Sequence, residues 1–231
     1  MRKKFALIII YCIAIVFAVD LIRKTVIIIT NTSNRLFINV VTNLILYILL
    51  VSLGMIILRR ELKIDFVNFK NFHSKAEYIA RGYLLLIGAN FIGRIILMIL
   101  DYQQKSVNQL GIESLLKSKY MIIAAISIII GPIIEELVFR KSLIDLLVFK
   151  GKYSPIISVI VSSLLFGLIH VIFNTQNNIK ELFLLIPYFF QGMVLGYLYV
   201  KQDYNIQIPI FVHMLNNFIA VLVIVFVPAG F

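Results

Sequence analysis

Ionisable and amide side chains occur in three stretches of the sequence that are otherwise apolar. These side chains are Glu135, Glu136 and Arg140, then His170, and then His213 with Asn217. An ionisable side chain near the middle of a bilayer costs about 2.5–3.5 kcal/mol on insertion scales, so each of them needs a partner or a task. A carboxylate, two imidazoles and a carboxamide together suit the activation of water against a carbonyl group, with donors for the oxyanion that forms.

Helical spacing gives the two adjacent glutamates different surroundings. Glu136 and Arg140 are four residues apart, about 40° around an α-helix, with the acid on the N-terminal side, which favours an ion pair. Glu135 and Arg140 are five residues apart, about 140° around the helix, so the Glu135 carboxylate lacks this partner. An unpaired carboxylate in an apolar environment is a candidate general base.

The two histidines have neighbours at helical spacing as well. Phe166 precedes His170 by four residues, so its ring is expected to pack beside the imidazole. His213 and Asn217 are also four residues apart, whereas Asn216 points about 60° away and is expected to matter less. Taken singly, an intramembrane histidine is more often a hydrogen-bond partner between helices, and a Glu–Arg pair is usually an internal ion pair. Together these residues favour a hydrolytic site.

The same residues form three short motifs, which read EExxxR at 135–140, FxxxH at 166–170 and HxxxN at 213–217. All three are complete, occur in this order and lie in apolar stretches. With this pattern the chain resembles the CPBP family of intramembrane proteases, which includes the type II CAAX prenyl endopeptidases and many bacterial proteins linked to bacteriocins. The resemblance covers roughly residues 111–227, whereas residues 1–110 carry no comparable motif.

The resemblance implies a role for each motif residue. The implied roles are water activation by Glu135 with help from His170, an oxyanion site of His213 and Asn217, and support by Glu136, Arg140 and Phe166. Glu135, His170 and His213 also match the ligand set of His₂Glu zinc hydrolases, so a divalent metal such as zinc and the absence of any cofactor are both open. The lack of a short HxxxH spacing favours the metal-free mechanism.

Membrane helices must position these residues. Of the 231 residues, 61% are hydrophobic and 14% are charged, which excludes a soluble globular domain. The apolar stretches have the length of helices that cross a bilayer. We predict an all-α, polytopic transmembrane bundle of about seven spans, with six to eight allowed, in which residues 1–231 form a single integral membrane domain. The predicted spans are Phe5–Val19, Leu36–Leu58, Tyr78–Leu100, Tyr120–Phe149, Pro155–Phe173, Leu182–Val200 and Ile208–Val227.

The excess of basic residues, 22 Lys and Arg against 11 Asp and Glu, lies mostly beside or between the spans. Membrane topology and anionic lipid headgroups explain it better than nucleic-acid binding does. The distribution modestly favours a cytoplasmic N-terminus. The richness in Ile, Asn and Lys hints at an AT-rich bacterial genome, so we expect a bacterial cell membrane. The basic start with the apolar residues 5–19 also has the form of a signal peptide, but no cleavage site closes it, and Asp20 with Arg23 and Lys24 indicates the end of a first membrane helix.

Other polar residues have simpler interpretations. His73 is expected at the surface, and Asp145 is expected to be hydrated or paired with Lys141. Asn90 and Gln191 are expected to form hydrogen bonds between helices. The single cysteine, Cys12, excludes an intramolecular disulfide.

The first functional hypothesis is an intramembrane endopeptidase that cleaves a membrane-associated peptide or protein. The alternative is a non-enzymatic immunity or scaffold protein that binds a bacteriocin or a sensor kinase, and a transporter is a third candidate. The sequence does not choose among prenylated CAAX proteins, peptide pheromones and bacteriocin leaders as substrates, and it does not indicate the oligomeric state.

Overall fold

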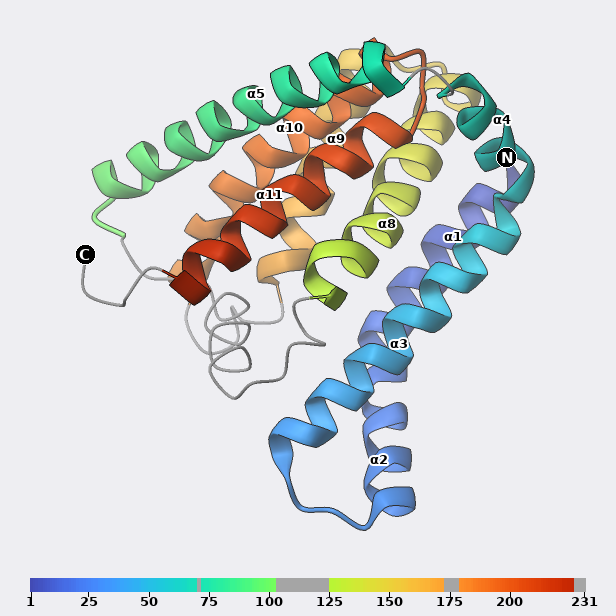
Figure 1. The fold of residues 1–231 in the computed structure, drawn as a ribbon, viewed down its shortest axis with the longest axis vertical. Helices are drawn as coiled ribbons and strands as arrows, with labels where there is room; N and C mark the ends of the chain where they lie inside the picture. Colours follow the sequence, from blue (N-terminus) through green and yellow to red (C-terminus); the bar gives the residue numbers. More distant parts are fainter. Residues whose placement is uncertain (70–71, 103–124, 173–178, 227–231) are drawn as a thin grey trace.

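The computed structural model describes residues 1–69, 72–102, 125–172 and 179–226, apart from the side chains of 72–74 (Figure 1). These residues form helices joined by short turns, with no strand among them, which confirms the all-α fold class. Residues 110 and 111, between which the resemblance to the protease family was expected to begin, lie outside the described residues. The side chain of His73 does as well.

The helices follow one another along the chain, and several adjoining segments form one continuous helix. In order they are α1 (Arg2–Ile13), η1 (Ala14–Ala18), α2 (Val19–Thr30), α3 (Arg35–Ile57), α4 (Arg59–Asn68), α5 (Phe72–Ile99), η2 (Ile126–Ile130), α8 (Gly131–Glu136), η3 (Leu137–Ile144), η4 (Leu146–Lys150), α9 (Pro155–Val171), η5 (Ile179–Leu184), α10 (Leu185–Lys201) and α11 (Gln207–Phe226). The segment η5 is a 3₁₀-helix, and η1 to η4 have the wider π-helical hydrogen-bond pattern, which is frequent at functional sites.

Five helices in the described part of the chain are long and apolar enough to cross a membrane. They are Arg2–Thr30, Arg35–Ile57, Lys75–Ile99, Ile179–Lys201 and Gln207–Phe226. The other two predicted spans also hold helices, but α9 has only 17 residues, and the helix from η2 to η4 carries the charged EExxxR motif. The chain is therefore an integral membrane protein with a polytopic helical fold.

The first membrane helix is longer than predicted, because it does not end near Asp20. Asp20 and Arg23 form an exposed ion pair of 3.4 Å on the helix surface, so these charges do not interrupt the backbone. The helix ends after Thr30, where Asn31 adopts a left-handed conformation with φ 47°. Asparagine is one of the few residues that tolerate this C-terminal conformation.

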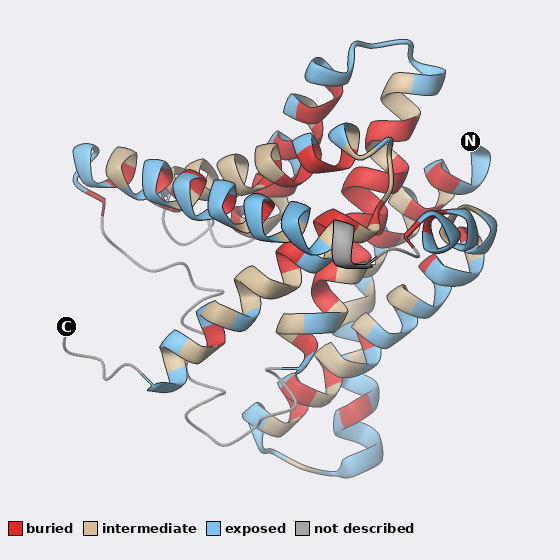
Figure 2. Cartoon of the chain, turned by 45° about the horizontal axis from the view of Figure 1, so that its top comes forward, coloured by how far each residue is buried: buried red, intermediate tan, exposed pale blue. Residues whose placement is uncertain are grey.

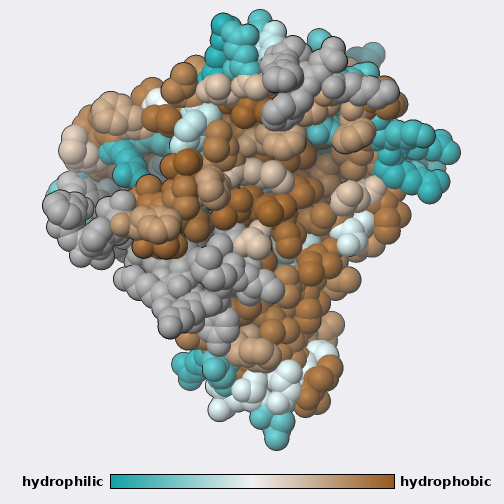
Figure 3. All heavy atoms as spheres, in the orientation of Figure 1, coloured by the Kyte–Doolittle hydropathy of each residue, from teal (hydrophilic) through white to brown (hydrophobic). Residues whose placement is uncertain are grey.

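The helix from η2 to η4 lies between two groups of helices. Figure 1 shows α1 and α3 on one side of it and α11 on the other, and α1 contacts η3 while α11 contacts η2 and α8. The main apolar core, which includes Leu7, Leu50, Leu137 and Phe166, fills the space where these groups meet. In Figure 2 the buried residues lie mainly where the helices contact one another. In Figure 3 hydrophobic residues cover much of the coloured surface in view, as expected for helices that face lipid.

Buried ion pairs fix one end of this central helix. Asp145 pairs with Lys4 of α1 and accepts a hydrogen bond of 2.7 Å from the Tyr199 hydroxyl. The prediction that Asp145 pairs with Lys141 is thus wrong, because Lys141 forms an ion pair of 2.6 Å with Asp65 of α4. The carboxylates of Asp145 and Asp65 each pair with a lysine on another helix. Spacing along one helix does not predict such pairs. The predicted hydrogen bonds of Asn90 and Gln191 between helices are confirmed.

Glycine allows α10 to cross α5 closely. A Cβ atom placed on Gly93 would lie 2.9 Å from the Cα atom of Pro187, whereas a Cβ on Gly88 of the same helix would meet nothing within 4 Å. Small residues at such crossings let membrane helices approach through their backbones. The crossing at Gly93 therefore sets the distance between these helices.

We expect Gly93→Ala to lower the free energy of unfolding by about 1–3 kcal/mol, because the added methyl group overpacks a contact with backbone atoms. Gly88→Ala is the matched control and should leave stability unchanged or slightly raised, since alanine is the better helix former. Thermal unfolding of both variants in the same detergent measures the difference. Equal melting temperatures would show that the crossing is not tight.

Candidate active site

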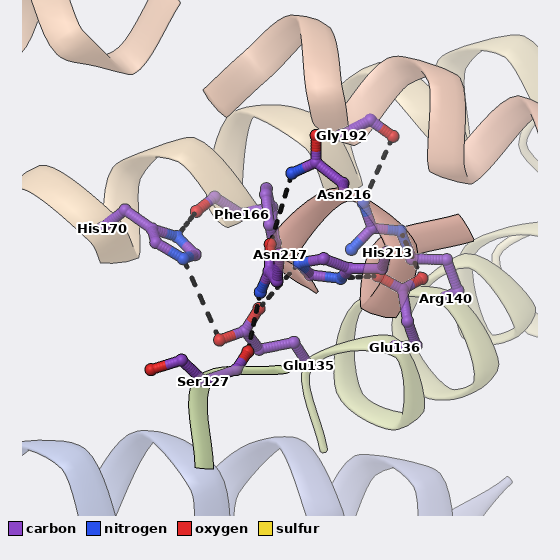
Figure 4. Close-up of polar contacts among 10 residues, drawn as sticks. All are labelled: Ser127, Glu135, Glu136, Arg140, Phe166, His170, Gly192, His213, Asn216 and Asn217. Carbon is purple, nitrogen blue, oxygen red and sulfur yellow. Dashed lines mark hydrogen bonds and ion pairs between the residues drawn. The ribbon is translucent and has the colours of Figure 1, made fainter. Parts of the chain in front are cut away.

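The three motifs meet at one place inside the bundle (Figure 4). Glu135 comes from α8, His170 from the last turn of α9 and His213 from α11. The Nε2 atom of His170 lies 3.9 Å from Glu135 Oε1, and the Nε2 atom of His213 lies 3.7 Å from Glu135 Oε2. These distances exceed those of direct hydrogen bonds and suit a small group held between the carboxylate and the rings.

The hydrogen bonds of the two Nδ1 atoms define which ring nitrogens carry hydrogen. His170 Nδ1 lies 2.7 Å from the carbonyl oxygen of Phe166, and His213 Nδ1 lies 2.9 Å from Glu136 Oε1. A carbonyl and a carboxylate only accept, so both Nδ1 atoms donate. In the neutral rings both Nε2 atoms therefore present lone pairs towards the Glu135 carboxylate. The Glu135 carboxylate and the two Nε2 atoms are then three hydrogen-bond acceptors at one place. Such an arrangement can bind a group that donates hydrogen bonds.

Glu136 is fully buried and contacts two of the motif residues. Its carboxylate pairs with Arg140 Nε at 3.2 Å and accepts the hydrogen bond from His213. The predicted Glu136–Arg140 pair is present. Arg140, also fully buried, donates from Nη2 to the Gly192 carbonyl oxygen at 3.3 Å. The charges of Glu135, Glu136 and Arg140 sum to −1, so one proton on Glu135 or on either imidazole makes the group neutral.

Phe166 packs against the charged and aromatic members of the site. Its ring centroid lies 4.6 Å from that of His170 and 5.9 Å from that of His213, and the Arg140 guanidinium carbon lies 4.6 Å from it. The predicted contact between Phe166 and His170 is thus present. Tyr188 of α10 stacks on the His170 ring at 4.4 Å, a contact that the sequence did not indicate because the chain has 11 tyrosines.

The Asn217 carboxamide is held from two sides. Its Nδ2 donates to the carbonyl oxygen of Ser127 at 2.8 Å, and its Oδ1 accepts from Asn216 Nδ2 at 3.3 Å. Sequence reasoning missed Ser127, since it takes part through its backbone. Asn216 was expected to point away from His213, but it contacts Asn217 directly. The Asn217 amide keeps a second Nδ2 hydrogen for a further acceptor.

The donor chemistry of Glu135, His170 and His213 resembles that of a metal site, because each Nδ1–H is bonded to a carbonyl or a carboxylate. Across the described ranges, however, no group of three or more His, Cys, Asp and Glu side chains is arranged to hold a metal ion. The distances of 3.7 and 3.9 Å belong to a more open arrangement. A metal bound by these residues therefore stays a prediction.

Comparison with known proteins agrees with this geometry. Residues 117–219, which hold all three motifs, match the family described as type II CAAX prenyl endopeptidase Rce1-like. The resemblance to CAAX-type membrane proteases is confirmed. No solved structure shows significant similarity to the chain.

Two curated bacterial relatives carry peptidase names. The chain is 28% identical over 145 residues to the "Putative membrane peptidase YdiL" of Bacillus subtilis (strain 168), which covers 62% of this chain and 54% of the relative. It is 39% identical over 94 residues to the "Membrane-embedded CAAX protease MroQ" of Staphylococcus aureus (strain USA300), which covers 38% of this chain and 34% of the relative. The chain thus spans about half of the first relative and a third of the second.

The two glutamates should differ in their contribution to stability. Glu136→Gln removes the charge that balances Arg140 in a fully buried site, so we expect a loss of roughly 3–5 kcal/mol in unfolding free energy. Glu135→Gln should change stability little, since the nearest imidazole nitrogens lie 3.7 and 3.9 Å from its carboxylate. Thermal unfolding of the purified variants in detergent tests this. A larger loss for Glu135→Gln would reverse the two assignments.

Proposed function

We propose that this protein is an intramembrane endopeptidase that cleaves a membrane-associated peptide or protein with water activated by Glu135. The observation that supports this best is the convergence of the Nε2 atoms of His170 and His213 on the Glu135 carboxylate. The names of the relatives support the same reaction class.

In the proposed first step, a water molecule donates hydrogen bonds to Glu135 and to His170 Nε2. Glu135 accepts a proton as the water oxygen attacks the peptide carbonyl carbon, which forms a C–O bond and an oxyanion. The proton then passes to the amide nitrogen, the C–N bond breaks, and an acid and an amine leave. The orientation of the His170 ring is set by the Phe166 carbonyl and by the stacked Tyr188.

The oxyanion needs hydrogen-bond donors in a site that excludes water. We assign one to the second Nδ2 hydrogen of Asn217 and one to His213 when its Nε2 carries the extra proton of the group. Glu136 supports this ring because it accepts a hydrogen bond from Nδ1, and Arg140 pairs with Glu136 at 3.2 Å. This division gives Glu135 the role of base and leaves Glu136, Arg140 and Phe166 to support His213.

We also propose an orientation of the site in the membrane. The basic N-terminal residues, the basic start of α4 and the residues after η4 gather at one end of the bundle in Figure 1. By the positive-inside rule we propose that this end faces the cytoplasm of a bacterial cell.

We expect Glu135→Gln to reduce peptide cleavage by at least about 10²–10⁴-fold, the range attributed to a positioned acid or base. Cleavage of a fluorogenic peptide library by protein in nanodiscs measures this. Glu77→Gln is the matched control, because Glu77 is exposed and pairs with Arg81 on the surface of α5. Full cleavage by Glu135→Gln would reject Glu135 as the base. Absence of cleavage by the unchanged protein would favour the binding role of an immunity or scaffold protein instead.

Asn217→Ala should lower kcat by roughly 10²–10³-fold and leave KM nearly unchanged, because an oxyanion donor acts mainly in the transition state. Asn43→Ala is the control, since Asn43 lies on α3 and donates to the Asn39 carbonyl oxygen of its own helix. Steady-state cleavage of one peptide substrate gives both constants. A rise in KM at constant kcat would instead assign Asn217 to substrate binding.

The mechanism predicts that a strong chelator leaves cleavage unchanged, since the base and the donors are side chains. Dialysis against the chelator followed by zinc addition is the measurement, with His170→Ala and His213→Ala as comparisons. Loss of cleavage with the chelator and recovery with zinc would make Glu135, His170 and His213 metal ligands.

A further inference from the structure

Four side-chain amides form a continuous chain of hydrogen bonds that ends at the candidate site. Gln191 Nε2 of α10 donates to Asn90 Oδ1 of α5 at 2.8 Å, and Asn90 Nδ2 donates to Asn216 Oδ1 of α11 at 3.2 Å. Asn216 Nδ2 then donates to Asn217 Oδ1, and Asn217 Nδ2 donates to the Ser127 carbonyl oxygen. The chain joins three helices to the start of the helix that carries Glu135.

The last acceptor determines the direction of every bond in the chain. A backbone carbonyl cannot donate, so the Asn217 atom 2.8 Å from Ser127 has to be the nitrogen. Its oxygen then faces Asn216 and requires a donor there, which turns the Asn216 oxygen towards Asn90. The same reasoning turns the Asn90 oxygen towards Gln191. Reversing any one amide would place two donors or two acceptors against each other.

The close helix crossing described above brings the first two amides together. Asn90 lies about one turn before Gly93 on α5, and Gln191 lies one turn after Pro187 on α10. The four amides are only partly buried, yet they lie within helices whose other residues are mainly apolar. In such surroundings an amide without a partner is unfavourable, so the chain satisfies all four together.

We propose that Asn216 is a positioning residue that fixes the orientation of the Asn217 carboxamide for the reaction, and that Asn90 and Gln191 extend this support. A carboxamide that turned over would present an oxygen, and therefore repulsion, to a developing oxyanion. The bond to the Ser127 carbonyl opposes this turn at Asn217 Nδ2, and the bond from Asn216 opposes it at Oδ1, so losing Asn216 leaves only one of the two restraints. This inference rests on the proposed function, in which Asn217 is an oxyanion donor.

The loss of kcat should decrease with distance from Asn217 along the chain of hydrogen-bonded amides. Asn216→Ala removes the bond to Asn217 and is expected to lower kcat about 10-fold with KM unchanged. Asn90→Ala and Gln191→Ala act through one and two further amides, so each is expected to have a smaller effect than the one before. Asn43→Ala again serves as the control for loss of an amide from a membrane helix.

A double-mutant cycle separates positioning from a general structural role. If Asn216 acts through Asn217, adding Asn216→Ala to the Asn217→Ala variant should lower kcat by less than about twofold. If the two losses multiply, Asn216 acts independently and the inference is overturned. Asn90→Ala in the same two backgrounds gives a second cycle should Asn216→Ala fail to fold.

A measurement without substrate distinguishes failure of this inference from failure of the proposed function. In protein labelled with ¹⁵N-asparagine, the Asn217 side-chain signals are those lost in Asn217→Ala. These signals should shift in Asn216→Ala and stay in place in Asn43→Ala. Unshifted signals would overturn the amide chain. If the Asn217 signals shift but the protein cleaves no peptide, the hydrogen-bonded amides are as described and the proposed function is wrong.

Discussion

The buried Glu136 carboxylate, held between Arg140 and His213, is the contact on which the site depends. Neither Glu136 nor Arg140 has any exposed surface, so their charges are stabilised by each other, by hydrogen bonds and, for Arg140, by the Phe166 ring beneath the guanidinium. Because Glu136 also binds His213 Nδ1, the ion pair fixes α11 against the central helix. Because Arg140 donates to the Gly192 carbonyl, the same pair reaches α10. One charge pair thus determines where three helices lie.

Adjacent positions on one helix give the two glutamates opposite environments. Glu136 has its cation and its donor within 3.2 Å, whereas the Glu135 carboxylate faces two lone pairs at 3.7 and 3.9 Å. A carboxylate whose oxygens have a cation and a donor as partners stabilises the fold, whereas a carboxylate without such close partners is available to accept a proton. The difference follows from about 100° of rotation per residue around the helix. The proposed base and the buried ion-pair partner of Arg140 are therefore two consecutive residues.

Contacts within one helix of the site could be predicted from residue spacing. Few of the contacts between helices could be predicted in this way. The pair of Glu136 with Arg140 and the contact of Phe166 with His170 follow from four-residue spacing. The partners of Asp145 and Lys141 do not, because they lie 141 and 76 residues away in sequence, on α1 and α4. Nor does spacing show that Asn216, which points away from His213, touches Asn217 itself. The first helix extends beyond the predicted end because Asp20 forms an ion pair with Arg23 on the helix surface, so its charge does not end the helix.

Polar contacts have a particular importance in a bundle that lipid surrounds. Between membrane helices there is no hydrophobic driving force of the kind that folds a soluble domain, since lipid tails are as apolar as leucine. Close packing and hydrogen bonds must then select which helices meet. The central helix is bound at one end by the ion pairs of Asp145 and Lys141, in its middle by Glu136 and Arg140, and at its start by the amide chain through Ser127. The contacts that assemble the bundle thus also place the Glu135 carboxylate opposite the two imidazoles.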